Sequence, residues 1–264
     1  EDDRDHPVLS ERLKAEKIAR LIETKKGKLE ASAIDEARAH LWHEGTPRTV
    51  AVIVNRVAAA KSVHATLREI AGKDGFDVEL MIGSMRPLDR ERQIARMRTV
   101  FGGGRCERDR PFVLVATQCV EVGADYDFDA MITQCASLEA LRQRFGRLNR
   151  GGRPIETRAV ILMDPADLKD PDKLDDDKPL DPVYGNAMAR TWHWLNEIAS
   201  SDGSDAPGVD VGIEAIEGRV ARLESDDELG PLLSPHGDRR APVMLPAYLD
   251  ALSQTNPDPA VGPD

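Results

Sequence analysis

Cysteine is scarce in this sequence. The 264 residues include three cysteines, Cys106, Cys119 and Cys135, which are far apart, odd in number and form no Cys-x-x-Cys pair. A disulfide framework needs an even set of cysteines and a structural zinc site needs short cysteine or histidine spacings, so both kinds of site are excluded. We expect reduced cysteines, with Cys119 and Cys135 packed near the ends of strands.

Long hydrophobic runs are missing as well. No apolar run approaches the roughly 18 residues of a membrane span, and the charged start from Glu1 to Asp5 is unlike a secretory signal peptide. Hydrophobic residues make up 41% of the chain and charged residues 31%, which is typical of a soluble globular protein. We therefore expect a cytoplasmic protein that makes no membrane contact.

Net positive charge is also lacking. The formal net charge is -11, whereas a free-standing nucleic-acid binder usually presents a broad basic face. This balance argues against a protein that coats nucleic acid over a large surface. Any nucleic acid would have to be held by a small, local set of donors.

Two signatures of phosphate and metal binding are absent. The chain has no G-x-x-x-x-G-K-[ST] cradle, and the Gly102–Gly104 run lacks both the lysine and a following helix. No Asp-Glu pair closes a strand to hold magnesium, because the nearest match, Asp226–Glu228, lies in an acidic loop. His40 and His43 flank Trp42 without a third ligand nearby, so we expect no metal site. The chain should not be a complete ATPase.

What the sequence does contain is an alternation of strand and helix patterns. Short apolar runs rich in β-branched residues are typical of strands buried on both faces, and amphipathic stretches separate them. This alternation predicts an α/β fold with a parallel sheet covered on both sides, whose ligands lie at the carboxyl ends of the strands. The predicted strands are 49–55, 78–82, 112–116, 130–133 and 159–163, and the predicted helices between them are 58–71, 87–100 and the one capped by Ser137.

Both ends of the chain show a different pattern. Ser10 is a candidate N-cap for an amphipathic helix that ends before Gly27, and a second helix is predicted from about Ala31 to His43. Residues 164–181 are rich in aspartate and proline, which is typical of a solvated linker. Helices are predicted at 183–199, where the aromatic side chains should pack in the core, and at 209–223, before a proline-rich end.

The segment Leu141–Arg153 is the most distinctive stretch of the chain, because it carries five arginines and no acid. Residues three and four apart share a helix face, so Gln143 and Arg147 can point the same way, and Arg150 can follow if the helix continues past Gly146. A guanidinium is always charged and offers a planar fork of donors, which suits phosphate. The alternative is an ordinary solvated helix face.

A second group of polar residues follows the strand that ends at Ala116. The Thr117 hydroxyl at the end of a buried strand can bond a phosphodiester oxygen or a ligand phosphate. Gly123 allows close approach of a ligand to the backbone, and Asp125 is suited to accept from a ribose hydroxyl. Taken alone, a threonine in this position is more often a simple cap.

The order of these groups resembles the C-terminal RecA-like domain of superfamily 2 helicases. Thr117–Asp125 is similar to helicase motif V, Gln143–Arg150 to motif VI (Q-R-x-G-R-x-x-R) and Val52–Arg56 to motif IV. The resemblance covers about residues 50–163 and rests on three motifs in order on a parallel-sheet pattern. It implies a RecA-like helicase domain at 48–165, preceded by a helical linker region at 1–47 and followed by an acidic linker and helical appendage at 166–264.

The resemblance can be narrowed to the helicase-nuclease of type I CRISPR interference. Ala116–Glu121, Asp125–Asp129 and Gln143–Arg150 carry this likeness, and Met85–Arg90 together with Ala241–Leu249 is similar to the type I-U (I-G) branch. The family also carries a metal nuclease of HD type, but this chain contains no His-Asp dipeptide. Cleavage would therefore require residues outside it.

The resemblance implies a role for each matched residue. Gln143 would orient the γ-phosphate or the attacking water, and Arg147 and Arg150 would act as arginine fingers. Nucleotide binding would involve Gly123, Asp125, Arg147 and Arg150, and backbone contacts to single-stranded DNA would come from Thr117, Asn55, Arg56 and Arg86. ATP and Mg²⁺ would be held mainly by a first RecA-like motor domain, and further partners would be a CRISPR RNA-guided surveillance complex and an HD nuclease domain.

Two alternatives remain open from the sequence. The chain could belong to another superfamily 2 motor that acts on DNA or RNA, since backbone contacts do not distinguish the two. It could instead be a docking module that kept the fold and has no turnover. The retained set Gln143, Arg147 and Arg150 disfavours a docking module, because a scaffold has no need of two fingers at this spacing.

Overall fold

The computed structural model describes residues 6–83, 87–101, 109–121, 126–175, 177–201, 208–225 and 228–233. The chain divides into two compact units, Glu1–Ser234 and Pro235–Asp264, and every described residue belongs to the first. The expected site residues Arg86, Gly123 and Asp125 lie outside the described residues, as do Cys106 and the Ala241–Leu249 segment.

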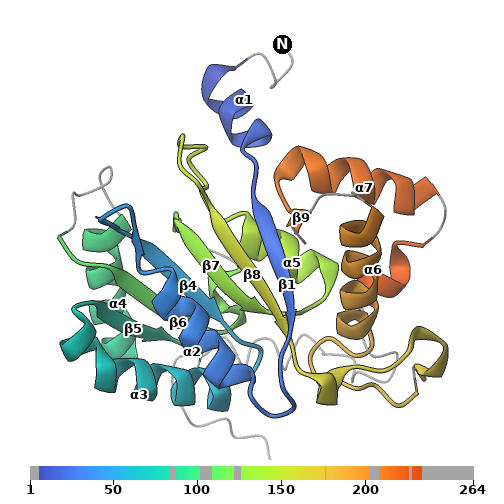
Figure 1. Cartoon of the computed structure of the whole chain (residues 1–264), viewed down its shortest axis with the longest axis horizontal. Coiled ribbons are helices and arrows are strands. Elements are labelled where there is room, and N and C mark those ends of the chain that lie inside the picture. The colour runs from blue at the N-terminus through green and yellow to red at the C-terminus, as the bar shows by residue number, and fades with distance from the viewer. Residues whose placement is uncertain are drawn as a thin grey trace, which may run out of the picture. The chain divides into compact units, whose positions relative to one another are not determined.

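A seven-stranded sheet forms the centre of the first unit (Figure 1). Its strands are parallel except β9, which pairs antiparallel with β1. This arrangement confirms the predicted α/β class, in which right-handed crossovers place helices on both faces of the sheet. The strand order is β5-β6-β4-β7-β8-β1-β9, with β1 at Ile18–Glu23, β4 at Thr49–Ile53, β5 at Asp77–Met81, β6 at Phe112–Ala116, β7 at Ala130–Gln134, β8 at Arg158–Met163 and β9 at Val209–Asp210.

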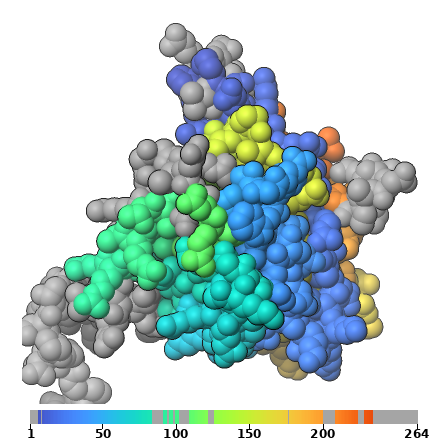
Figure 2. Space-filling view, turned by 60° about the vertical axis from the view of Figure 1, so that its left-hand side comes forward, coloured from blue at the N-terminus to red at the C-terminus, as the bar shows by residue number. Residues whose placement is uncertain are grey.

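The helices cover both faces of the sheet. α2 and α3 lie side by side on one face, as Figure 2 shows from outside, and α5 and α6 belong to the core on the other face. A separate small hairpin joins β2 (Trp42–His43) to β3 (Thr46–Pro47). The helices are α1 at Pro7–Lys14, α2 at Leu29–Ala39, α3 at Val57–Asp74, α4 at Pro87–Phe101, α5 at Leu138–Phe145, α6 at Ala187–Ser201 and α7 at Ile213–Ser225.

Strand β4 shows why its sequence is apolar throughout. Val50 and Val52 contribute to the core beneath α2 and α3, whereas Ala51 and Ile53 contribute to the core on the opposite face. Successive side chains of a strand point to opposite faces, so a strand covered on both sides needs apolar residues at every position. All five residues of β4 are buried.

Several helix predictions near the chain ends were wrong in part, and one of them is the helix expected to reach His43, which ends at Ala39 before β2. The helix expected from Ser10 to before Gly27 is the short helix α1 followed by strand β1, which pairs with β8 over five residues. The helix expected from Val209 begins at Ile213, because Val209–Asp210 forms β9 beside β1. Both segments gain backbone partners at the sheet edge that a local pattern does not reveal. The sheet therefore continues beyond β8.

The acidic segment 164–181 is largely solvated, as predicted, but both ends are buried. Asp164 accepts hydrogen bonds from the backbone N–H groups of Gly27 and Ala166 at 2.8 and 2.9 Å, and Asp181 is 1% exposed. Short 3-10 turns at Pro165–Asp167 and Pro171–Lys173 lie between them. The expected divisions after residues 47 and 165 do not coincide with the two compact units, since β1 and β9 join the same sheet.

Among the described residues, no helix combines the length and the apolar character needed to cross a bilayer.

Candidate functional site: the carboxyl edge of the sheet and helix α5

Three segments that are far apart in sequence meet at the carboxyl edge of the sheet. The parallel pairing places Ile53 of β4 beside Ala116 of β6 and beside Thr133 of β7. The residues that follow these strands therefore emerge next to one another. They are Asn55 and Arg56 after β4, Thr117–Glu121 after β6 and Cys135–Ser137 after β7.

Helix α5 starts and ends at defined residues. Ser137 caps its N-terminus, as predicted, by accepting from the backbone N–H of Ala140 at 3.4 Å. The helix ends at Phe145 with Gly146 as C-cap, so the helical continuation that would place Arg150 does not occur. The next residues are held against the sheet instead, where the backbone N–H of Phe128 donates to the Arg147 carbonyl at 2.9 Å.

A buried lysine occupies the C-terminal end of α5. The Lys17 ammonium donates to the Phe145 carbonyl at 3.0 Å, and the residue is 1% exposed. A cation in this position is favoured by the helix dipole. Burial nevertheless lowers the pKa of Lys17 to about 8, with nearby Asp127 and Asp210 opposing the shift. The ammonium helps fix the point where the chain leaves the helix.

The five arginines of the 141–153 segment have different environments. Arg153 forms a two-bond ion pair with Asp127 and a further bond of 2.7 Å to Asp129. Arg142 pairs with Glu217 of α7 on the surface. The uniform phosphate-binding row suggested by the sequence is therefore not formed, because these two arginines bind carboxylates of the same chain.

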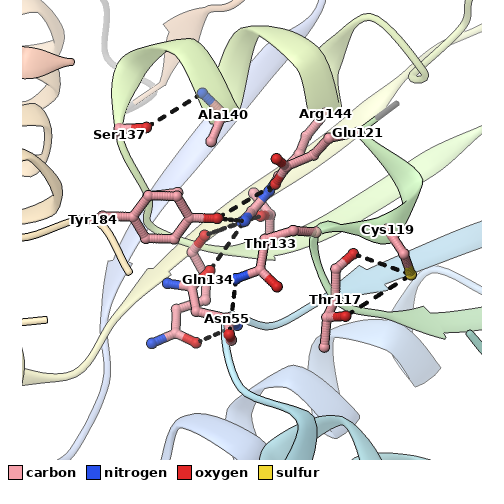
Figure 3. Close-up of polar contacts among 12 residues, drawn as sticks. Asn55, Thr117, Cys119, Glu121, Thr133, Gln134, Ser137, Ala140, Arg144 and Tyr184 are labelled. Carbon is pink, nitrogen blue, oxygen red and sulfur yellow. Dashed lines mark hydrogen bonds and ion pairs between the residues drawn. The ribbon is translucent and has the colours of Figure 1, made fainter. Parts of the chain in front are cut away.

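Arg144 is completely buried and lies at the centre of a polar network (Figure 3). A buried guanidinium requires partners for its donors, and here they come from four separate segments of the chain. It donates to Glu121 Oε1 at 2.9 Å, Thr133 Oγ1 at 2.8 Å, the Gln134 carbonyl at 2.9 Å, Asn55 Oδ1 at 3.1 Å and the Tyr184 hydroxyl at 2.8 Å.

Glu121 links this network to Arg147. Its carboxylate binds Arg144, while its backbone carbonyl accepts from Arg147 Nη2 at 3.2 Å. Arg150 is oriented in a different way, because its backbone N–H donates to Asp127 Oδ1 at 2.7 Å and its side chain is exposed. A hydrogen bond to a backbone carbonyl therefore positions the Arg147 side chain, whereas a hydrogen bond from its own backbone N–H positions Arg150.

A cavity of about 390 Å³ lies beside the end of α5. Gln143, Arg147 and Arg150 all line it, so the structure brings the three expected catalytic residues to one place. The opposite wall comes from α7 and from the residue that follows β9, through Val211, Ile213, Ile216 and Glu217. Its arginine donors suit an anionic group such as a phosphate.

The expected DNA-contact residues differ in exposure. The Arg56 side chain is 54% exposed and lies 3.5 Å from a carboxylate oxygen of Asp181. Thr117 is 3% exposed, with its hydroxyl 3.8 Å from Cys119 Sγ. Asn55 is also 3% exposed and its side-chain amide bonds to the Cys135 carbonyl at 2.7 Å as well as to Arg144, which leaves little of this side chain for a strand contact.

Three residues of the network had no assigned role from the sequence. Arg144 is part of the recognised motif, so its spacing could have drawn attention to it, and Glu121 lies in the segment similar to motif V. The sequence predicted only that the Tyr184 ring packs in the core, and the structure confirms this burial. Its hydroxyl contact could not be foreseen, because residues 40 positions apart form it.

The two described cysteines are free, as expected, and each follows a strand. Burial raises the pKa of the Cys135 thiol to about 12. Cys119 lies in the short turn Gln118–Val120, where its thiol donates to the Met81 carbonyl at 3.2 Å. Both thiols therefore act as packed, hydrogen-bonded groups.

Comparison with known proteins shows which family this chain resembles. Residues 46–153 match the family described as CRISPR-associated nuclease/helicase Cas3, C-terminal. The CRISPR-associated nuclease/helicase Cas3 of Haloferax volcanii is 26% identical over 78% of this chain and 19% of its own length. The CRISPR-associated endonuclease/helicase Cas3 of Thermus thermophilus is 33% identical over 58% of this chain and 18% of its own length. The chain thus spans about a fifth of the curated relatives that it matches.

Solved structures support the same fold. The structure described as T. fusca Cas3-ADP has a TM-score of 0.56 at 20% identity and covers 81% of this chain and 25% of its own. A CRISPR RNA-guided surveillance complex in a pre-nicking state has a chain with a TM-score of 0.57 at 21% identity, covering 83% of this chain and 26% of its own. The fold is thus RecA-like α/β, while the type I-U branch stays a prediction. Through residues 46–153, the chain is similar to the C-terminal domain of the CRISPR-associated nuclease/helicase Cas3.

Proposed function

We propose that this chain supplies the second motor domain of an ATP-dependent helicase or translocase that acts on single-stranded DNA in CRISPR interference. The observation that carries the proposal is the cavity beside α5, which Gln143, Arg147 and Arg150 line together. The match of residues 46–153 to the Cas3 C-terminal family supports the helicase part, and the neighbouring structures with ADP and with ATP in their descriptions support a nucleotide as ligand.

In this proposal Arg147 and Arg150 are arginine fingers for a nucleotide that is held by a first RecA-like domain. Charge develops on the transferring γ-phosphoryl group, and a guanidinium supplied from a neighbouring domain stabilises it. Gln143 would orient the γ-phosphate or the attacking water, and Gly123 and Asp125 would contact the nucleotide from this side. ATP and Mg²⁺ would be held mainly by the first domain, because this sequence has no phosphate cradle.

We also propose that DNA crosses the carboxyl edge of the sheet. Arg56 is the best-supported contact, since its guanidinium is exposed at this edge. Thr117 and Arg86 would add backbone contacts, and such contacts position a strand without reading its sequence. Asn55 would act mainly by holding the edge in shape, because its amide already bonds Cys135 and Arg144.

The partners follow from the same proposal. The motor would require a first RecA-like domain and would work with an HD nuclease domain. A CRISPR RNA-guided surveillance complex would recruit it, which the description of one structural neighbour supports. The protein would act in the cytoplasm.

The test is DNA-stimulated ATP hydrolysis by the full-length protein. Arg147→Ala should lower turnover by roughly 10³-fold with nearly unchanged oligonucleotide affinity, and Arg147→Lys should not restore it, because the fork geometry is lost. Arg142→Ala is the matched control, since Arg142 lines the same cavity but pairs with Glu217. Thr117→Ala should show the reverse pattern, with weakened DNA stimulation and most of the basal turnover kept.

Weaker DNA binding by Arg147→Ala, with intact turnover for each bound strand, would show that the arginines clamp nucleic acid and that the finger assignment is mistaken. Equal losses in Arg147→Ala and Arg142→Ala would point to a general effect of positive charge around the cavity.

A further inference from the structure

A tight turn connects the acidic segment to helix α6, and we name residues 181–186 the strap. Asp181 Oδ1 accepts from the backbone N–H groups of Val183 and Tyr184, both at 2.8 Å. The backbones of Asp181 and Gly185 exchange hydrogen bonds of 2.9 and 3.2 Å, and Gly185 has a φ of 59°. These bonds give the strap one defined shape. It lies outside residues 46–153, which match the family.

One end of the strap contacts the exposed arginine at the sheet edge. Asp181 is 1% exposed, and its Oδ2 lies 3.5 Å from Arg56 Nη2. A strong charge-assisted hydrogen bond is about 2.7–2.9 Å long, so this ion pair is loose. A phosphate that approached Arg56 would compete with Asp181 for the same guanidinium.

The other end of the strap contacts the arginine network. The Tyr184 hydroxyl accepts from Arg144 Nη2 at 2.8 Å and lies 3.4 Å from Glu121 Oε1, to which it can donate (Figure 3). Burial raises the pKa of Tyr184, so the phenol keeps its proton at neutral pH. Through Glu121, the same contacts reach Arg147, whose guanidinium donates to the Glu121 carbonyl.

The two ends are close together in sequence but serve different parts of the candidate site. Asp181 faces the proposed DNA contact, whereas Tyr184 holds the glutamate that orients a proposed finger. Only Pro182 and Val183 lie between them, in a turn that the hydrogen bonds accepted by Asp181 stabilise. A shift of the Asp181 carboxylate therefore shifts the backbone of Tyr184.

We propose that the strap couples DNA binding to ATP turnover, with Asp181 and Tyr184 as positioning residues. The inference rests on the proposed motor function and adds a structural link between its DNA contact and its arginine finger. When a DNA phosphate takes over Arg56, Asp181 loses its cation and the turn relaxes. The Tyr184 hydroxyl then changes its hold on Glu121 and Arg144, and the backbone carbonyl of Glu121 brings Arg147 into its working position.

The experiment uses the full-length protein and two conservative variants. Tyr184→Phe keeps the ring in the core and removes only the hydroxyl. Asp181→Asn keeps an oxygen that can accept from the backbone of Val183 and Tyr184 but removes the charge that competes for Arg56. Thr191→Val is the matched control, because it removes a buried hydroxyl of α6 that bonds the Leu232 carbonyl at 3.3 Å, away from the network. Each variant is assayed for basal turnover, DNA-stimulated turnover, oligonucleotide affinity and thermal unfolding.

Tyr184→Phe should lower the ratio of stimulated to basal turnover by at least about fivefold, a typical size for coupling between two sites. Its oligonucleotide affinity should stay close to that of the unmodified protein, and its basal turnover should fall by less than its stimulated turnover. Asp181→Asn should bind the oligonucleotide more tightly, since Arg56 no longer has a competing carboxylate, while its stimulation falls. Thr191→Val should keep the normal ratio.

Three results would overturn the inference. The first is an unchanged stimulation ratio in Tyr184→Phe, and the second is a parallel fall of basal and stimulated turnover, as expected for simple destabilisation. The third is unchanged or weaker oligonucleotide binding by Asp181→Asn. Failure of the motor function itself is distinguishable, because the unmodified protein would then show no DNA-stimulated hydrolysis and the inference would fall with it.

Discussion

Replacement of Arg144 by methionine tests the buried network directly. Methionine has a similar length and fills the space, but it removes a fully buried guanidinium that makes five hydrogen bonds. The most costly consequence concerns Glu121, whose side chain is only 14% exposed and would lose its cation. Four further acceptors would lose a donor in the protein interior.

The expected cost can be worked from these contacts. Breaking a buried ion pair by removing one partner destabilises a protein by about 3–5 kcal/mol, because the remaining charge is left uncompensated. The free energy of unfolding of a whole domain is about 5–15 kcal/mol, so Arg144→Met should remove a large share of it. For a domain of this size the melting temperature should fall by roughly 6–20 °C.

Urea unfolding of the 264-residue chain, followed by circular dichroism and tryptophan fluorescence, measures this change. Arg142→Met is the matched control, since Arg142 and Glu217 form a surface pair and such pairs contribute about 1 kcal/mol or less. Glu121→Gln, combined with Arg144→Met, should recover part of the loss because it removes the unpaired charge.

The reasoning would be refuted if Arg144→Met cost no more than Arg142→Met. It would also be refuted if Glu121→Gln deepened the loss in the Arg144→Met background. Either result would mean that the five contacts of Arg144 do not stabilise the folded state as their burial implies.

Three further predictions concern the chain by itself. The purified chain should bind ATP very weakly and release no phosphate, because it lacks the cradle that positions a phosphoryl group; magnesium-dependent turnover that Arg147→Ala abolishes would contradict this. Its affinity for single-stranded DNA should be feeble and steeply salt-dependent, since few backbone contacts act against a net charge of -11; a titration at low and moderate salt would disprove it by finding tight, salt-independent binding. Burial lowers the Lys17 pKa from 10.5 to about 8, so the unfolded chain binds more protons than the folded chain between these pH values. The free energy of unfolding, relative to Lys17→Met, should therefore rise as pH increases through this window, as urea titrations at several pH values can measure. A difference between the two proteins that does not change with pH would show that the ammonium is not buried.

The sequence by itself determined the central part of the fold. Strands β4, β6, β7 and β8 were predicted within one or two residues, because each is an apolar run between polar boundaries. The cap of α5 was also predicted, since Ser137 acts on its own neighbours. These features depend on local patterns, which a sequence contains in full.

Only part of the candidate site could be predicted from local sequence patterns. The spacing predicted that Gln143 and Arg147 point the same way, and the family resemblance implied that both act with Arg150. All three line one cavity. The expected helical row was wrong, because α5 ends at Phe145 and the chain then follows contacts with Phe128. The arginines of one short segment share the same chemistry, so the sequence could not assign them to different partners.

Tertiary structure alone decided which arginine faces solvent and which is buried. Arg144 is buried because Glu121, Asn55 and Tyr184, which lie 23, 89 and 40 residues away, converge on it. Strand β1 has the same origin, since a segment with helical spacing becomes a strand when β8 and β9 offer hydrogen bonds on both sides. In both cases the stabilising hydrogen bonds come from groups distant in sequence. A buried backbone or guanidinium donor without a partner costs more free energy than the local helix propensity of the segment can offset.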